Sequence, residues 1–308
     1  MKFFKFMVVV LCFTVTSCTI DKTDFEAEMR RDVTEYFEFK EAVSLHTNGY
    51  SISVEALNGT FFKGYNEIRL KIVNTQTNQP LNGSDVTLLP LLTNSDSNNT
   101  TSCPHRYDLV YNSDEQFYSG YAVFTSESDP MERWEVYISF SDNAQTFTVH
   151  QPINVQVQTN KNLNMSAFIG NDGEQYFIAL VAPQKPKVAE NELVAGIYKY
   201  NQPTTPAGNF PDPSQFSYSE VSNHTLLLDP RMPEPSMGNH SSPNNQDLTQ
   251  QNDGLYYGVV NYTMTGNWTL NFILQNQNGE VIKGTEVPTD FTPGIEGAKS
   301  ELYIDILF

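Results

Sequence analysis

Cysteine is scarce in this chain, and its distribution excludes a disulfide framework. The 308 residues include three cysteines, Cys12, Cys18 and Cys103. The first two lie close to the N-terminus, so Cys103 is alone in the body of the chain and has no intramolecular partner there. Its thiol can be a small buried apolar group, a free thiol or a soft metal ligand.

Positive charge is also scarce. There are 18 Lys and Arg residues against 36 Asp and Glu, which gives a formal net charge of −18. Nucleic-acid binding requires a basic footprint, and electrostatic docking on anionic lipid requires basic clusters. The charge balance therefore excludes both kinds of partner, and it is compatible with an acidic soluble surface.

The chain lacks the short motifs of the common enzyme classes. It has no Gly-rich phosphate loop, no Gly-X-Ser-X-Gly elbow and no His-Glu-X-X-His zinc helix. Its five histidines are scattered along the sequence. We therefore predict that the protein is not an enzyme. A hydrolase would require two carboxylates, or a histidine and a nucleophile, to converge in one cleft.

No apolar run reaches the length of a membrane span. A spanning helix needs about 20 apolar residues, whereas the N-terminal run from Phe6 to Val15 has only about ten and follows Lys2 and Lys5. A short apolar core after basic residues is typical of a secretory signal. A single transmembrane anchor is the less favoured alternative.

The signal ends in Val15-Thr16-Ser17-Cys18, which resembles the lipobox of bacterial lipoproteins. The resemblance implies that residues 1–17 are removed and that Cys18 carries a diacylglyceryl group. It places the protein in the cell envelope of a Gram-negative bacterium, held to the outer membrane by the lipid, on its periplasmic or its surface face. Loss of the two signal lysines would change the formal net charge from −18 to −20.

Residues 18–45 are rich in Asp and Glu, and we predict that they form a tether between the lipid and the body. The acidic stretch after Cys18 also resembles the surface-export signals of some Bacteroidota lipoproteins.

The two halves of the remaining sequence resemble each other, and this internal repeat predicts two domains, residues 46–160 and 161–308. The only two tryptophans, Trp134 and Trp268, each open a run that alternates apolar and polar residues. Upstream of each lies a glycine in an aromatic and apolar segment, Gly120 and Gly258 respectively. Ile52 and Val54 in the first copy align with Phe177 and Ala179 in the second. The next matching segments, which begin at Asn66 and Asn191, follow with the same offset, so the alignment needs no gap.

Alternation with a period of two residues is typical of a half-buried strand. No segment of the body has a helical stripe, and Asn-Gly and Asp-Gly pairs mark tight turns between the strands. We therefore predict an all-β protein with two tandem immunoglobulin-like β-sandwiches. The second copy carries a proline-rich insertion, residues 202–213, which we expect to be a loop.

One stretch of the second copy contains soft ligands. Met232, Met237 and His240 lie within nine residues of one another in a segment rich in Pro and Gly, which we expect to be a loop, and Met264 lies on the expected strand before Trp268. Thioethers suit Cu(I), and imidazole suits both Cu(I) and Cu(II). This set is the candidate metal site, with copper as the ion.

The same stretch resembles the YtkA-like/FixH-like domain over roughly residues 190–285. The resemblance rests on Met232-Pro, Met237-X-X-His240, Ser242-Pro, Gly254-X-Tyr-X-Gly258 and Met264-X-Gly-X-Trp268. It implies a small envelope β-sandwich associated with copper handling or oxidase maturation and similar in layout to CopC-type copper binders. The first copy keeps only Cys103-Pro104-His105 at the equivalent loop, so it resembles a degenerate member.

Two alternatives stay open at this point. The methionines can simply fill irregular gaps at the end of the sandwich, with His240 fixing a turn, and Cys103 and His105 can be structural. The whole chain can instead be an adhesion or interaction module that presents loops to a protein or glycan partner. In either case Gly120, Trp134, Gly258 and Trp268 serve the cores.

Overall fold

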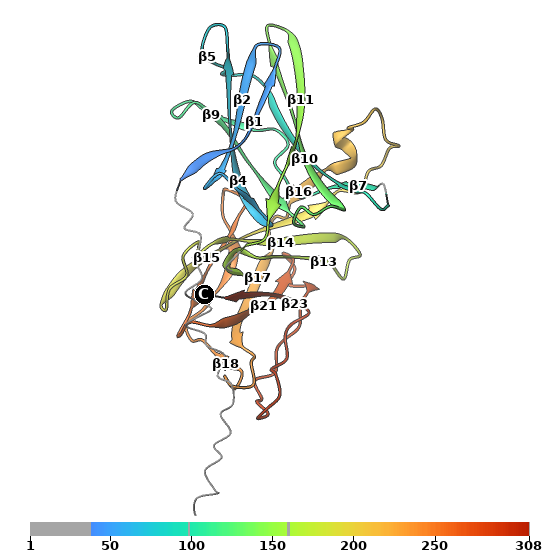
Figure 1. Cartoon of the computed structure of the whole chain (residues 1–308). Coiled ribbons are helices and arrows are strands. Elements are labelled where there is room, and N and C mark those ends of the chain that lie inside the picture. Colours follow the sequence, from blue (N-terminus) through green and yellow to red (C-terminus); the bar gives the residue numbers. More distant parts are fainter. Residues whose placement is uncertain (1–37, 98, 159–160, 308) are drawn as a thin grey trace, which may run out of the picture. The chain divides into compact units, whose positions relative to one another are not determined.

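The computed structural model describes residues 38–97, 99–158 and 161–307, and one compact unit contains all of them. The predicted signal, the predicted lipidation site Cys18 and most of the predicted tether lie outside the described residues. The described part is built of strands with two short 3₁₀ segments, as Figure 1 shows. Within these residues, none of the helical segments has the length and apolar character needed to cross a membrane.

The first half comprises strands β1 to β12 of the described chain. They are β1 (Phe39–Thr47), β2 (Tyr50–Leu57), β3 (Phe61–Phe62), β4 (Gly64–Asn74), β5 (Gln79–Pro80), β6 (Val86–Asn94), β7 (Asn99–Ser102), β8 (Val110–Asn112), β9 (Phe117–Phe124), β10 (Glu132–Asp142), β11 (Gln145–Ile153) and β12 (Val155–Gln156). One sheet has the order β1-β2-β4-β9-β8, with β5 on β4, and the second has the order β11-β10-β6-β7. Side chains from both sheets form a single hydrophobic core between them.

The second half follows a short 3₁₀ segment, Lys161–Leu163, and comprises strands β13 to β23. They are β13 (Met165–Ile169), β14 (Gln175–Ala182), β15 (Glu190–Tyr200), β16 (Tyr218–Glu220), β17 (Thr225–Met232), β18 (His240–Ser241), β19 (Gln246–Gln250), β20 (Tyr256–Asn261), β21 (Asn267–Gln275), β22 (Val281–Lys283) and β23 (Leu302–Leu307). A second 3₁₀ segment, Pro213–Phe216, precedes β16. Because β19 pairs with both β20 and β17, the two layers of this half are joined into one continuous sheet.

The strand order confirms the predicted immunoglobulin-like sandwich. In the first half, β2, β4, β9 and β8 lie side by side like strands A, B, E and D, and β6, β10 and β11 lie like C, F and G. In the second half, the same roles fall to β14, β15, β20 and β19, and to β17, β21 and β23. Each half adds one strand before strand A, β1 or β13.

The two halves also share a hydrogen-bonding motif made by an asparagine side chain, which supports the predicted repeat. The Asn66 amide donates to the carbonyls of Phe62 and Gly64, and its carbonyl oxygen accepts from the Phe62 N–H. Asn191 makes the same three bonds with residues four and two positions before it. Each asparagine satisfies the backbone where the chain enters strand B, so the same residue type stands at the same place twice.

The proposed alignment of the first segments is wrong by one residue. Ile52 pairs with Ile72, and in the second half Ile178, not Phe177, pairs with Ile197. Because successive residues of a strand face opposite sides, Phe177 points away from the core that contains Ile178.

Each tryptophan is buried in the core of its sandwich. Trp134 and Trp268 are fully buried, and their indole N–H groups donate to the carbonyls of Ser126 and Met264, both at 3.0 Å. Each ring meets an aromatic residue from the end of its strand E region, Phe124 at 5.0 Å and Tyr262 at 5.4 Å between ring centroids. These contacts satisfy the polar edge of each indole and bury its apolar body.

The predicted end of the tether at residue 45 is wrong. Strand β1 begins at Phe39 and pairs with β2 from Phe39 opposite Leu57 to Thr47 opposite Tyr50. The acidic residues Glu38 and Glu41 therefore belong to the entrance and edge of the first sheet, where charged side chains on an edge strand discourage pairing with other chains.

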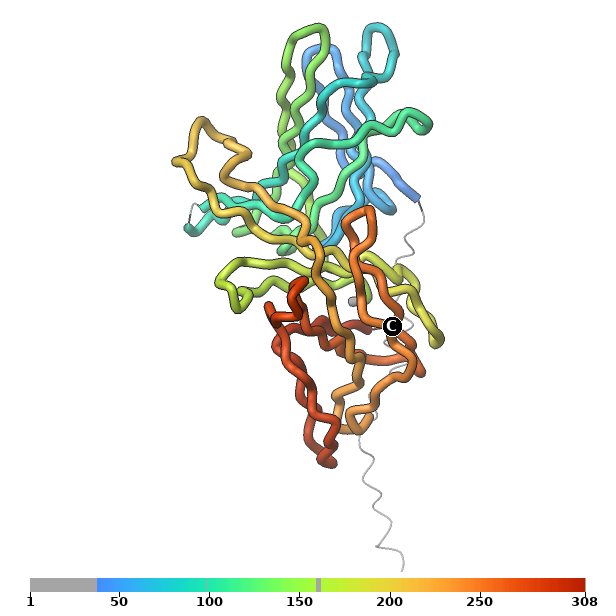
Figure 2. The backbone as a smooth tube through the Cα atoms, turned by 180° about the vertical axis from the view of Figure 1, so that it is seen from behind, coloured from blue at the N-terminus to red at the C-terminus, as the bar shows by residue number. Residues whose placement is uncertain are grey.

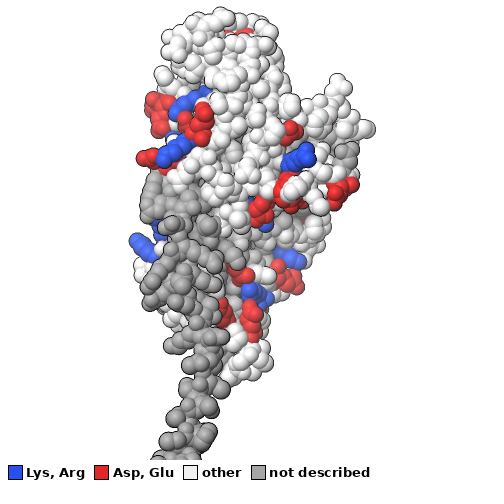
Figure 3. Space-filling view, in the orientation of Figure 1, with Lys and Arg blue, Asp and Glu red and all other residues white. Residues whose placement is uncertain are grey.

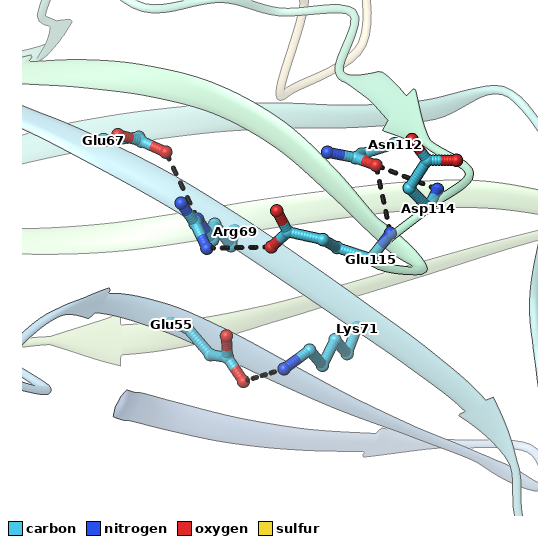
Figure 4. A network of polar contacts seen from close by, with 7 residues as sticks. All are labelled: Glu55, Glu67, Arg69, Lys71, Asn112, Asp114 and Glu115. Carbon is cyan, nitrogen blue, oxygen red and sulfur yellow. Dashed lines mark hydrogen bonds and ion pairs between the residues drawn. The ribbon is translucent and has the colours of Figure 1, made fainter. Parts of the chain in front are cut away.

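Charges on the outer face of the first sheet are paired. Arg69 lies between Glu67 and Glu115, at 3.2 and 3.5 Å, and Lys71 lies 2.8 Å from Glu55, as Figure 4 shows. Figure 3 shows a similar pattern over the visible face: most basic side chains lie beside acidic ones, and wide areas carry no charge. Part of the surface excess of acid is therefore compensated locally by neighbouring basic side chains.

The two halves contact each other through a small apolar cluster and a polar network. Tyr121 and Val123 of β9 form the cluster with Phe177, Ala179 and Tyr198. The polar part is centred on the Glu220 carboxylate, which accepts from the Tyr121 hydroxyl at 3.0 Å and from Arg106 at 3.2 Å. Figure 2 allows these segments to be followed from behind.

Candidate functional site

Met232 is a core residue and not a loop residue, which corrects the sequence prediction. Strand β17 runs through Met232, and the side chain is 1% exposed. A Cβ added at Gly266 would lie 2.9 Å from the Met232 methyl group. The thioether therefore packs closely inside the second sandwich, at the end that contains Trp268.

His240 lies beside Met232. The two residues are direct partners in the pairing of β17 with β18. The Nε2 atom of His240 is 3.0 Å from the Thr263 hydroxyl oxygen, and the His240 ring centroid is 6.2 Å from the ring centroid of Trp268. The imidazole thus has a hydrogen-bond partner and a packing partner within the protein.

The other two predicted ligands pack on the same core. Met237 and Met264 are half-buried against it, and the Met237 carbonyl accepts from the His240 N–H at 3.3 Å. Met264 lies in the bend between β20 and β21 and not on a strand, which corrects its predicted place. The structure therefore gathers the four residues at one end of the second half.

The donor set at this end fits a soft ion by its chemistry, since it offers three thioethers and one imidazole. In the described residues there is no group of three or more His, Cys, Asp or Glu side chains arranged to hold a metal. A metal at this end would therefore depend on the methionines, whose packing role is visible in each case.

Cys103 and His105 are both buried in the first half. Burial raises the pKa of the Cys103 thiol well above its ordinary value. Burial lowers the pKa of His105 to about 4, although the 2.7 Å contact of its Nδ1 with the Cys103 carbonyl opposes the shift. Both groups are neutral near pH 7, and their contacts are those of a packed turn.

A groove lies where the two halves meet, and sequence reasoning did not predict it. The groove has a volume of about 610 Å³. Its lining comes from β7 and Thr125 of the first half and, in the second half, from β13 to β16 and the insertion between β15 and β16: Thr100, Thr101, Ser102, Thr125, Ala167, Gln175, Phe177, Tyr200, Pro203, Ala207, Gly208, Phe210, Asp212, Gln215, Phe216 and Tyr218. The insertion projects as a loop in Figures 1 and 2.

The insertion is held in one shape by its own hydrogen bonds. One Asp212 oxygen accepts from the Ser214 N–H and hydroxyl, and the other accepts from the Gly208 N–H at 2.9 Å. These bonds, led by that from Gly208, lower the pKa of the Asp212 carboxyl. The Gln215 amide donates to the Thr205 carbonyl at 3.2 Å across the loop.

The tyrosines of the groove have their hydroxyls engaged by backbone. Tyr200 donates to the Gln215 carbonyl at 3.0 Å, and Tyr218 donates across the two halves to the Ser102 carbonyl at 2.8 Å. Burial raises the pKa of Tyr218, so its hydroxyl remains a donor. What these rings offer to a ligand is therefore mainly an apolar surface.

Phe210 is the exposed aromatic residue of the groove. It is 63% exposed, and its ring meets Tyr137 of β10 edge-on at 6.1 Å between centroids. The proline-rich insertion was visible in the sequence as a loop, but nothing in the sequence indicates that its tip contacts the first half. The sequence also does not indicate that Thr100, Thr101 and Ser102 line a groove, because threonine and serine are common on any strand.

Comparisons with known proteins add little. No family model matches the chain, and no curated protein matches it. Among solved structures, a chimeric titin Z1Z2–Z1Z2 tandem functionalised with an exogenous fibronectin peptide is similar, with 13% identity over 71% of this chain and 88% of that chain. Its TM-score is 0.16, so the assignment of the fold rests on the strand order described above.

Proposed function

We propose that the chain is a non-enzymatic recognition module of the cell envelope, anchored by lipid on Cys18, which binds a partner in the groove between its two halves. The groove carries the proposal. It is formed by both halves, it has a volume of about 610 Å³, and a preformed loop closes one side. A largely preformed concave site with apolar and a few polar groups is the usual form of a binding site.

The exposed ring of Phe210 supports a binding role. An aromatic side chain on a stiff loop provides contact area at little entropic cost on binding. The same groove offers little for catalysis, because its single carboxylate, Asp212, uses both oxygens to hold the loop. A general acid or base needs a free position near the reacting group.

The envelope location rests on the sequence around Cys18 and has its own test. Mass spectrometry of the membrane fraction should find a mature chain that begins at a lipid-modified Cys18, and Cys18→Ala should abolish the modification. A full-length, unmodified chain in the membrane fraction would contradict the anchor.

Binding in the groove is tested on a mixed array of neutral peptides and oligosaccharides. We expect the full chain to bind at least one class of ligand, and we expect Phe210→Ala to weaken that binding. Phe291→Ala is the matched control, because Phe291 is a second exposed phenylalanine, 42% exposed, outside the groove. Equal binding by both variants and the natural chain would place recognition elsewhere.

Copper binding in the second half is a second candidate function. It is favoured by one observation, the pairing of Met232 with His240 at the end where Met237 and Met264 also pack. A competition titration with Cu(I) should show weaker affinity for Met237→Ala and His240→Ala than for the natural chain. Met131→Ala, at an exposed methionine of the first half, is the control. Unchanged affinity in the first two variants would remove this candidate.

A further inference from the structure

We propose that the ligand of the groove is an uncharged saccharide; the inference rests on the proposed function of the groove. Three features of the lining carry it: the near absence of charge, the combination of aromatic rings with hydroxyl and amide groups, and the poor fit of the groove to an extended peptide.

Charge is the first feature. Of the 16 residues that line the groove, only Asp212 is ionisable as an acid or base near neutral pH. Its oxygens already accept three bonds from Gly208 and Ser214, so a cationic ligand would compete with the bonds that hold the loop. An anionic ligand would find no Lys or Arg among the lining residues and would approach a chain of net charge −18. The lining therefore selects a neutral ligand.

The second feature is the chemical mixture. Five of the lining residues are aromatic, and Phe210 is the most exposed of them. A pyranose ring has apolar C–H faces that pack on aromatic rings and a rim of hydroxyls that need hydrogen bonds. Thr100, Thr101 and Gln175, residues that carry hydroxyl and amide groups able to donate and accept hydrogen bonds, line the groove with those rings.

The third feature disfavours an extended peptide. Such a peptide would bind by adding a strand to the edge of a sheet. Three strands that line the groove pair on one side only, β7, β13 and β16, and they have four, five and three residues. The carbonyl of the last residue of β7, Ser102, already accepts from Tyr218. The groove thus has little free backbone for strand addition, whereas a saccharide needs none.

The test measures the binding of defined oligosaccharides to the full chain in a detergent without a sugar headgroup. The probes are neutral hexamers of cellulose, maltose-type glucan, laminarin, xylan and mannan. Hexagalacturonate and hexameric chitosan serve as the anionic and cationic probes, and neutral decapeptides serve as the peptide probe. We expect binding to at least one neutral hexamer and to neither charged hexamer.

Variants assign the binding to the groove. Phe210→Ala should weaken the affinity for the neutral hexamer by about tenfold or more, as truncation of an aromatic anchor does, whereas Phe291→Ala should leave it unchanged. Gln175→Ala should weaken binding without loss of thermal stability, because the side chain lies in the lining of the groove.

The outcomes separate the inference from the proposed function. Binding of decapeptides that depends on Phe210, without binding of any neutral hexamer, would overturn the saccharide and leave the groove as the recognition site. Preference for a charged hexamer would also overturn the inference. Binding that is independent of Phe210 for every probe would overturn both.

Discussion

Gly120 and Gly258 illustrate how much depends on single positions in this protein. Both lie on strand E of their half, beside strand D, with which it pairs in the same sheet. A Cβ on Gly258 would lie 2.5 Å from the Gln246 carbonyl oxygen, and one on Gly120 would collide with a Leu109 methyl group. The sequence identified both glycines as core residues by their repetition, but the close approach of strand D depends on how it pairs with strand E, which the sequence pattern does not indicate.

Gly258→Ala should therefore destabilise the second half. The neighbour that must move is backbone and cannot rotate away, so we expect a loss of about 1–3 kcal/mol, as for other overpacked sites. Urea denaturation followed by tryptophan fluorescence measures it. Gly208→Ala is the control, because its Cβ would meet only the end of the Asp212 side chain; an equal loss in both variants would contradict the crowding argument.

His105 gives a pH dependence with a defined sign. Its pKa is lowered to about 4 by burial, while that of an unfolded histidine is about 6.5. Since the unfolded chain binds the proton more readily, the contribution of neutral His105 is fully present above about pH 6.5 and is lost as the pH falls towards 4. The groups facing the ring are the Cys103 carbonyl, Tyr107 and Tyr218, none of which is a carboxylate.

His105→Gln should flatten this loss of stability between about pH 6.5 and pH 4, where one such group contributes at most about 1.4 kcal/mol per pH unit. Urea midpoints measured across this range provide the readout. His46→Gln, at an exposed histidine of β1, is the control. A slope that is identical in all three proteins would contradict the assignment of the dependence to His105.

Among the elements, strands with one clearly apolar face were predictable and strands covered on both faces were not. The alternation at Trp134, Val136 and Ile138 matches the burial of β10 residue by residue. In β21, however, the polar residues Thr269 and Asn271 are also buried. Their partners, Asp305 and the Asp229 carbonyl, lie 36 and 42 residues away, and no local pattern indicates such contacts.

The insertion is the element that shapes the groove, and Asp212 holds it. Asp212→Ala removes the acceptor for the N–H groups of Gly208 and Ser214. We expect faster hydrogen–deuterium exchange in the peptide that spans residues 202–216, with unchanged exchange in β21. Asp290→Ala, at an exposed aspartate of another loop, is the control. Unchanged exchange in the insertion would show that the prolines alone hold its shape.

In the whole molecule, the repeat was predictable, but the junction of its two copies was not. Tryptophan and glycine positions agree between the halves, and the strand order confirms that agreement. The junction joins Tyr121 and Val123 to residues more than fifty positions away, Phe177, Ala179 and Tyr198. The groove has the same origin, since its walls at Thr101 and Phe210 lie about a hundred residues apart in the sequence.

Ala179→Arg should uncouple the halves. Ala179 is fully buried in the junction cluster, and a buried charge without a partner is costly. Calorimetry should show one unfolding transition for the natural chain and two for the variant. Val188→Arg, at an exposed valine, should keep one transition. A single transition in Ala179→Arg would mean that the junction contributes little to cooperativity.

Isothermal titration of the full chain with neutral hexasaccharides shows whether the groove between the halves is a recognition site for a neutral saccharide. We expect saturable binding of at least one hexamer, with affinity reduced about tenfold or more by Phe210→Ala and unchanged by Phe291→Ala. The absence of binding to every neutral hexamer, or equal affinity in all three proteins, would contradict it.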